Sequence, residues 1–497
     1  MSRIICDANQ TKLGIVTLDQ DIPQDHICRF IVDFVEDSYD ELEIEQSTNT
    51  VGRSAYSIKS LVKLDIYATF DNVKSADRIA EFAKYHSIYQ FVCDGITPSA
   101  SKIREFRREY RKYYRHLLEL TLKKALDEDF TDFNHVACDG TPRKAHNNYQ
   151  NKISKKEVII LLNFLQTGNL PDKDLNKLHS PALRILKRTD MSNQDKINLL
   201  LDIKYEFKNT RQDKIPINDF TARKMKNKKG NFIIGHNIQT AVDTKTSLIC
   251  AVHVSSSPTD HYELPNIGKK AIENIGFSPN YMSADNIYLN ESSLLFLVEN
   301  GIDGLIKNRK QSKGKIKKLN ANPFHKDHFI YIRELDAFLC PNNHYLYFYR
   351  EYSDYNKLDK FPNAKQRAYR NYEACKNCPY RNKCFSKKQN HRIITESGST
   401  LIRDMYFKME LEEYSKKYDE RSRVEGPFGY FRTQYQFESD IITDIHYIED
   451  TMNLLALVYN LKRLYNLKHG LNSCEDETSV NNGLMLTDFQ STLIAEI

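Results

Sequence analysis

Several features that would assign the chain to a special class are scarce or missing. Its 497 residues include no tryptophan, only 17 glycines and 14 prolines, and 10 cysteines that mostly stand alone. So little glycine and proline excludes a fibrous or low-complexity chain, and scattered cysteines do not suit a secreted disulfide scaffold. No apolar run approaches the roughly 20 residues of a membrane helix, and the first residues lack a signal peptide. We therefore expect a soluble, cytoplasmic protein.

The composition supplies ample core material and an uneven charge. Hydrophobic residues make up 40% of the chain and aromatic residues 11%, enough for two or three domains. The net charge is 72 − 66 = +6, and basic residues gather at 102–115, 221–229 and 307–318. Local basic stripes indicate contact with a phosphate backbone. Lysine-rich loops that are merely solvated are the alternative.

Residues 1–126 predict an all-helical domain. Ser57 and Ser75 are candidate caps of two short helices, and a long amphipathic helix follows from about Ser101 to Leu126. Arginines recur along that helix at i, i+4, i+7 and i+11, and therefore share one face: Arg104, Arg108, Arg111 and Arg115. Because the guanidinium fork suits oxyanions, we interpret this face as a DNA-phosphate contact. An ordinary solvated face remains the alternative.

Strands and helices alternate after residue 130, and two strands end on an acid. These are His135–Asp139 and Tyr281–Asp285. Open sheets bind ligands beyond the carboxyl ends of their strands, so the two carboxylates can share a divalent cation. Hard oxygen ligands select Mg²⁺ or Mn²⁺. A third acid should come from a later helix packed on the same sheet, and Glu425 is the candidate. Each acid alone could equally be a turn residue.

The same pattern divides the chain into parts. We expect a catalytic core at 130–310 plus 405–468, within which 144–229 is a helical insertion. A second insertion with a cysteine cluster occupies 311–404, and an acidic tail occupies 469–497.

Several segments resemble the bacterial insertion-sequence transposases of the DDE class. Cys138-Asp-Gly-Thr141 is similar to the family's first-acid strand end, and Gly235–Asp243 to a strand that follows it. Asp285 with Tyr288 resembles the second-acid segment, although Asn286-Ile287 replaces its basic residue and glycine. Leu454–Arg463 resembles the closing helix of these proteins.

The third acid lies in a segment that resembles the Y-x2-R-x3-E-x6-K signature of one transposase group. Tyr418, Arg421 and Glu425 match its spacing, and Arg432 stands at the lysine position. In a helix, Arg421 would lie one turn before Glu425 on the same face, where it could neutralise a phosphate or only form a salt bridge with Glu425. Tyr418 could contact DNA or be a core residue. Lysines beside the predicted sheet would add non-specific phosphate contacts: Lys144, Lys226 and Lys310.

The resemblance implies a fold, a reaction and partners. The fold would be α/β, an α+β mixed sheet of the ribonuclease-H-like type, preceded by an all-helical DNA-binding domain. Asp139, Asp285 and Glu425 would hold two Mg²⁺ (or Mn²⁺) ions for cleavage at the element ends and 3′-hydroxyl attack on target DNA. Double-stranded DNA would be the partner, a homodimer would form the synaptic complex, and the protein would lie at the bacterial nucleoid. A nuclease without strand transfer and a decayed or domesticated DNA-binding protein are the alternatives.

Four cysteines lie in the second predicted insertion. Cys375 and Cys378 form a C-x2-C pair, Cys384 follows six residues later, and Cys340 lies 35 residues upstream. Four thiolates suit a structural zinc ion, which would give folding energy to a small module. His344 and His391 are alternative ligands. Reduced, unliganded thiols and an iron–sulfur cluster are the other interpretations.

Overall fold

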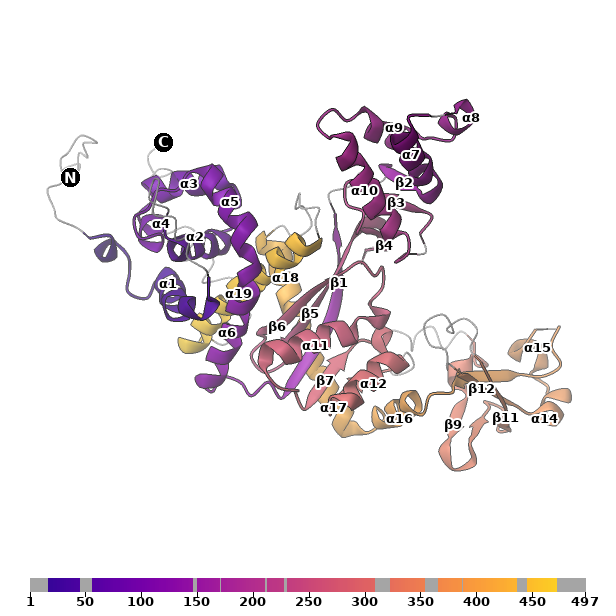
Figure 1. Cartoon of the computed structure of the whole chain (residues 1–497). Helices are drawn as coiled ribbons and strands as arrows, with labels where there is room; N and C mark the ends of the chain where they lie inside the picture. Colours follow the sequence, from indigo (N-terminus) through magenta and orange to yellow (C-terminus); the bar gives the residue numbers. More distant parts are fainter. Residues whose placement is uncertain are drawn as a thin grey trace, which may run out of the picture. The chain divides into compact units, whose positions relative to one another are not determined.

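The computed structural model describes residues 17–44, 56–145, 150–169, 171–210, 212–227, 230–308, 322–353, 365–386, 388–435 and 445–471. These residues form two units (Figure 1). The helical unit combines the described residues up to Asp132 with Tyr430–Tyr435 and the last helix. The sheet unit contains the described residues from Phe133 to Gly429. The sheet unit thus ends at Gly429, whereas the predicted core included 405–468.

Seven α-helices of the described chain build the helical unit: α1 (Ile27–Ser38), α2 (Ile58–Phe70), α3 (Ala76–Tyr85), α4 (Ser87–Val92), α5 (Ala100–Tyr110), α6 (Tyr114–Asp127) and α19 (Ile445–Lys468). The predicted caps are confirmed, because the hydroxyls of Ser57 and Ser75 accept hydrogen bonds from backbone N–H groups of the first helical turn.

The predicted continuous helix from 101 to 126 is interrupted. Helix α5 ends at Tyr110, the 3-10 turn Arg111–Tyr113 follows, and α6 begins at Tyr114. Because the turn changes the helical phase, Arg111 is directed inward and is 8% exposed. The prediction that all four arginines share one face is therefore wrong for Arg111.

Helix α19 is buried on all sides instead of along one stripe. Consecutive residues from Thr451 to Lys462 are buried, which explains the absence of an amphipathic pattern. Its Asn460 side chain donates to the hydroxyl of Thr121 on α6 over 3.0 Å, and Tyr465 packs edge-on against Phe30 of α1. The helix thus holds early helices of the same unit together. Across the described residues, no helix is both long and apolar enough to cross a membrane.

The main sheet comprises β1 (His135–Lys144), β4 (Arg223–Lys226), β5 (Phe232–Asp243), β6 (Ile249–Ser255), β7 (Tyr281–Ala284) and β8 (Asp303–Ile306). Strand β5 runs antiparallel to β1, β4 and β6, whereas β7 and β8 run parallel to β1. Helices α11 (Leu264–Ile275) and α12 (Glu291–Glu299) pack on this sheet (Figure 1). This six-stranded mixed sheet, with parallel pairing of β1, β7 and β8 and antiparallel pairing elsewhere, fits a ribonuclease-H-like core, so the predicted fold class is confirmed.

Strand β1 is longer than predicted. It continues past Asp139 to Lys144 because β5 pairs with it as far as Gly235. Asp139 therefore lies inside β1, at the point where the parallel pairing with β7 stops.

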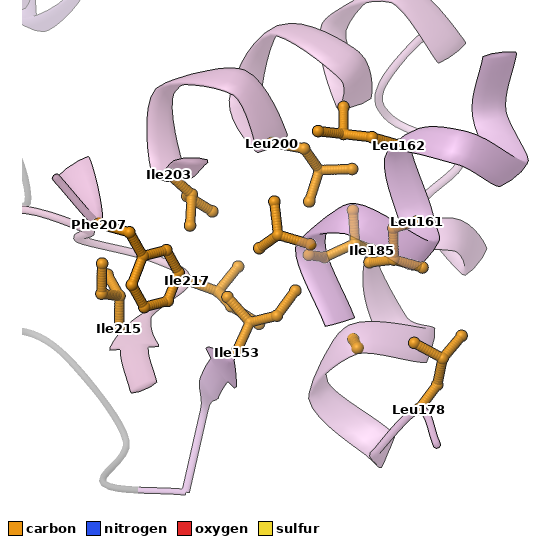
Figure 2. Packing of buried hydrophobic residues seen from close by; sticks show 12 residues of the cluster. Ile153, Leu161, Leu162, Leu178, Ile185, Leu200, Ile203, Phe207, Ile215 and Ile217 are labelled. Carbon is orange, nitrogen blue, oxygen red and sulfur yellow. The ribbon is translucent and has the colours of Figure 1, made fainter. Parts of the chain in front are cut away.

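The first insertion has a core of its own. It contains β2 (Lys152–Ser154), α7 (Lys155–Thr167), α8 (Asp172–Leu175), α9 (Ser180–Lys187), α10 (Asn193–Glu206) and β3 (Lys214–Pro216). Figure 2 shows the buried side chains of Leu161, Ile185 and Leu200 pointing toward one another among these elements. The prediction of a wholly helical segment at 144–229 is wrong at its ends, because Lys144 belongs to β1 and β4 joins the main sheet.

The second insertion forms a separate five-stranded antiparallel sheet, here called the β-module (described residues of 322–397). Its elements are β9 (Ile330–Ile332), β10 (Ala337–Leu339), β11 (Tyr345–Ser353), β12 (Lys365–Arg370), α14 (Tyr372–Lys376), α15 (Arg381–Cys384) and β13 (Ile393–Ser397). Helices α16 (Thr400–Lys408), α17 (Glu412–Asp419) and α18 (Glu425–Tyr435) follow.

Candidate active site

Two aspartates lie side by side at one edge of the main sheet. The parallel register pairs Cys138 of β1 with Ala284 of β7, and Asp139 and Asp285 are the next residues on each strand. Neighbouring strands are about 4.8 Å apart, so the two backbones hold the carboxylates close together. Both residues are half-buried, and the Asp285 carboxylate accepts a hydrogen bond of 2.6 Å from the N–H of Asn286. Two acids 146 positions apart in the sequence thus share one site.

Tyr418 and Arg421 lie beside these two acids. Burial by itself lowers the pKa of the Arg421 guanidinium, but the neighbouring Tyr418, Asp139 and Asp285 raise it above its ordinary value. Burial raises the pKa of Tyr418. The Lys307 ammonium holds this segment to the sheet, 4.4 Å from the Tyr418 ring centroid. The structure therefore assembles four of the predicted site residues.

The segment that contains Arg421 is anchored at the other end of β1. The imidazole of His135 lies with Nδ1 2.8 Å from Oε2 of Glu420 and Nε2 2.8 Å from the hydroxyl of Ser283. Thr244 also donates to the Glu420 carboxylate over 3.3 Å. These contacts fix the 3-10 turn Glu420–Val424 against the sheet.

Glu425 is not brought to the two aspartates in this structure. It is exposed and begins α18, directly after the 3-10 turn that contains Arg421. Because residues three apart eclipse in a 3-10 helix, the predicted common face of Arg421 and Glu425 is wrong. Within the described chain no ion pair joins these two residues. Arg432 does lie two turns after Glu425 in α18 and is exposed.

A polar network that the sequence did not reveal supports the site. The Asp260 carboxylate accepts hydrogen bonds from the side-chain amides of Asn237, at 2.7 Å, and Gln239, at 2.6 Å. The hydroxyl of Tyr288 donates to Gln239 over 2.5 Å. A Cβ atom at Gly140 would overlap both Asp260 and Gln239, so glycine is required there. The network thus links the residue after Asp139 to the turn after Asp285.

The carboxylate of Asp285 affects the pKa of Asp260. Burial raises the pKa of Asp260, and the carboxylates of Glu263 and Asp285 add to this rise against the two amide hydrogen bonds. The sequence did carry a signal for its two amide partners. Asn237 and Gln239 alternate on a strand that is otherwise largely apolar, which places two amides on one buried face.

The two aspartates suit a divalent cation by their donor chemistry, because Mg²⁺ prefers carboxylate oxygens. Among the described residues, however, no three His, Cys, Asp or Glu side chains converge tightly enough to hold an ion. The assignment of Asp139 and Asp285 as cation ligands therefore stays a prediction.

The predicted DNA-contact arginines have different surroundings. Arg104 is exposed and pairs with Asp77 over 2.5 Å, and Arg115 is half-exposed and lies 3.3 Å from Glu119. Arg108 is exposed. Arg111 instead donates to the buried Asp65 carboxylate, so the structure gives it a structural role.

The predicted lysines lie at strand ends. Lys144 ends β1 and Lys226 ends β4, and both are exposed. The Lys226 ammonium is 5.4 Å from the Phe232 ring centroid, a cation–π contact across the β4–β5 pair. Lys310 lies outside the described residues.

All four cysteines of the predicted cluster line one small cavity of the β-module. The cavity volume is about 20 Å³. Cys340 follows β10, Cys375 lies in α14, Cys378 lies between α14 and α15, and Cys384 ends α15. Their thiols are free of disulfides. His344 also lines the cavity. The sequence thus predicted the grouping of the four side chains, although as placed they do not form one of the His, Cys, Asp or Glu groups that could hold a metal ion, none of which occurs among the described residues.

Comparisons with protein families identify two parts of the chain. A family described as "Transposase domain (DUF772)" matches residues 16–109. A family described as "Transposase DDE domain" matches residues 339–465, which include Tyr418, Arg421 and Glu425 but neither aspartate. Comparison with curated proteins and with solved structures gives no match.

The ribonuclease-H-like sheet and these two domains define a transposase, a class of nucleic-acid-cleaving enzyme that acts on DNA and uses divalent metal ions. The two matches indicate the insertion-sequence DDE transposase family.

Proposed function

We propose that this transposase cleaves DNA at the ends of its insertion sequence and joins the freed 3′-hydroxyl to target DNA. The observation that carries the proposal is the register of β1 and β7, which sets Asp139 beside Asp285 with Arg421 next to both. Carboxylates at this edge of an open sheet suit a phosphodiester substrate held through cations.

Asp139, Asp285 and Glu425 would hold two Mg²⁺ or Mn²⁺ ions. When bound, such ions activate the attacking oxygen and neutralise charge on the leaving oxygen. Glu425 is exposed at the first turn of α18, where a DNA backbone can reach it. It would join the two aspartates only after the segment rearranges. The chain would then belong to the group with the Y-R-E-K signature, with Arg432 in the lysine position.

Arg421 and Tyr418 would act on the scissile phosphate from the protein side. The guanidinium already lies in the field of the two aspartates, where it can donate to non-bridging phosphate oxygens. The Tyr418 ring contacts both Arg421 and Lys307 and would orient the arginine. Exposed basic residues would add non-specific affinity: Arg104, Arg108, Arg115, Lys144, Lys226, Lys310 and Arg432.

The function also implies an assembly and a place. Two element ends must be held together before joining, which favours a homodimer bound to double-stranded DNA. Such a protein would act in the cytoplasm, at the nucleoid.

Strand cleavage provides the test. The full-length protein would be incubated with Mg²⁺ and a duplex carrying the element's own end, in wild-type form and as Asp285→Ala. We expect metal-dependent nicking that Asp285→Ala abolishes and that Glu299→Ala, at an exposed acid of α12, retains. Nicking without joined products would instead indicate a nuclease. End binding without cleavage by the wild type would indicate a DNA-binding protein and overturn the proposal.

A further inference from the structure

The β-module has little apolar material to hold it together. Its buried core consists of Phe329, Phe338, Leu346, Tyr369 and Ile394, with Cys340 and Cys384 packed against them. Strand β11 exposes most of its side chains from Tyr347 to Ser353. A sheet with so small a core commonly depends on an additional cross-link.

The turn between β10 and β11 presents a sulfur atom in a defined manner. The N–H of Cys340 donates to the carbonyl of His344 over 2.8 Å, and the N–H of His344 points back to Sγ of Cys340 at 3.4 Å. Asn343 adopts a φ of 56°, which closes this tight turn. Backbone N–H groups directed at sulfur favour the thiolate form that binds metals.

Positive and polar groups surround the other thiols. The amide of Asn342 lies 3.8 Å from Sγ of Cys378. Arg392 lines the same cavity and donates from Nη1 to the carbonyl of Cys384, whereas its Nε is buried without a hydrogen-bond partner. A buried, unpaired guanidinium nitrogen is costly unless a negative group lies near it. Four thiolates around one dication would provide that negative charge.

We propose that Cys340, Cys375, Cys378 and Cys384 bind one Zn²⁺ ion as a four-thiolate structural site. Four soft sulfur donors select zinc among the common divalent ions. The cavity of about 20 Å³ has room for one ion, because a single water needs roughly 10–15 Å³. An iron–sulfur cluster contains several iron and sulfide atoms and needs far more space.

Binding would close the cavity. Each thiol loses its proton, and the sulfur atoms move inward until each lies about 2.3 Å from the ion. The site joins the β10–β11 turn to α14 and α15, so it fixes the base of the long β11 strand. This metal is separate from the ions proposed at Asp139 and Asp285.

Metal content of the purified full-length protein tests the site. Mass spectrometry of the elements should find about one zinc per chain in the wild type and in Asp285→Ala. Cys378→Ser and Cys384→Ser should each lower zinc to less than a fifth of the wild-type content. Cys93→Ala, at a buried cysteine of the helical unit, is the matched control and should keep its zinc.

A second measurement uses only the wild type, so its result does not depend on whether the variants fold. Wild-type protein loaded with Co²⁺ should show the absorption of tetrahedral cobalt bound to thiolates, and added Zn²⁺ should bleach it. The proposal would be overturned if the purified wild type contains no zinc and gives no such spectrum with Co²⁺. It would also be overturned if the protein carries iron and sulfide instead. None of these readouts depends on DNA cleavage, so the zinc site and the transposase function can fail independently.

Discussion

Arg111 and Asp65 form a buried ion pair in the helical unit, with Nε of Arg111 3.2 Å from the Asp65 carboxylate. Their side chains are 10% and 1% exposed. Arg107 lies 2.6 Å from the same carboxylate, and the hydroxyl of Tyr114 donates to it over 2.9 Å. One acid thus gathers three groups from α5, the 3-10 turn and α6.

Removing Arg111 should unfold the helical unit more easily. Arg111→Ala leaves Asp65 buried with one cation fewer, which should lower the free energy of unfolding by about 3–5 kcal/mol. Arg108→Ala, at an exposed position of α5, should change it by less than about 0.5 kcal/mol. Urea unfolding followed by circular dichroism measures both. Wild-type stability combined with weaker DNA binding in Arg111→Ala would show that Arg111 faces DNA after all.

Asp65 should make the helical unit sensitive to acid. Burial alone raises its pKa, but Arg107 and Arg111 hold the pKa well below the ordinary value of 3.8. The unfolded chain therefore takes up this proton first, and the stabilisation is complete above pH 3.8 and is lost as the pH falls below it. Asp65→Asn should be less stable at pH 7 and should lose less stability on acidification. An equal loss of stability on acidification in the wild type and in Asp65→Asn would contradict this.

His135 predicts a second pH effect, in the sheet unit. Burial lowers its pKa from the ordinary 6.5, although Glu420 and Asp243 oppose this and Lys417 assists it. Below pH 6.5 the unfolded chain binds a proton that the folded protein resists, so the free energy of unfolding should fall as the pH drops from 7.5 to about 5.5. His135→Gln should flatten this slope. An unchanged slope would assign the effect to other groups.

Gly140 should tolerate no side chain. Gly140→Ala places a methyl group onto Asp260 and Gln239, which should break their hydrogen bond and lower the free energy of unfolding by about 1–3 kcal/mol. Gly429→Ala, in α18 with open space around it, should stabilise the chain by up to about 1 kcal/mol. Thermal unfolding distinguishes the two variants. Equal effects would mean that Asp260 moves aside without cost.

Arg421 should matter more for DNA cleavage than Arg423 does. Arg421→Ala should reduce the rate of end cleavage by about 10²-fold, because a preorganised cation beside the phosphate is lost. Arg421→Lys should recover part of that rate, and Arg423→Ala, exposed in the same 3-10 turn, should cleave normally. Single-turnover cleavage rates measure the effect. A wild-type rate in Arg421→Ala would leave the arginine a packing role only.

The strands and the two aspartates could be predicted because their signals are local. Apolar runs that end on an acid identify β1 and β7, and parallel neighbours bring such ends together. The inward turn of Arg111 could not be predicted, since its partner Asp65 lies 46 positions away and the sequence pattern of α5 and α6 suits one continuous helix. Asp260 was missed for a similar reason, because only the folded sheet places it over Gly140.

The place of α19 in the helical unit has a consequence for how the protein is made. Thr121 and Phe30 leave the ribosome early, yet their partners Asn460 and Tyr465 are synthesised more than 300 residues later. At roughly 5–20 residues per second, the early helices wait on the order of tens of seconds for the helix that completes them. A message truncated before Ile445 therefore yields a nascent chain whose first domain stays open, whatever the state of its catalytic acids.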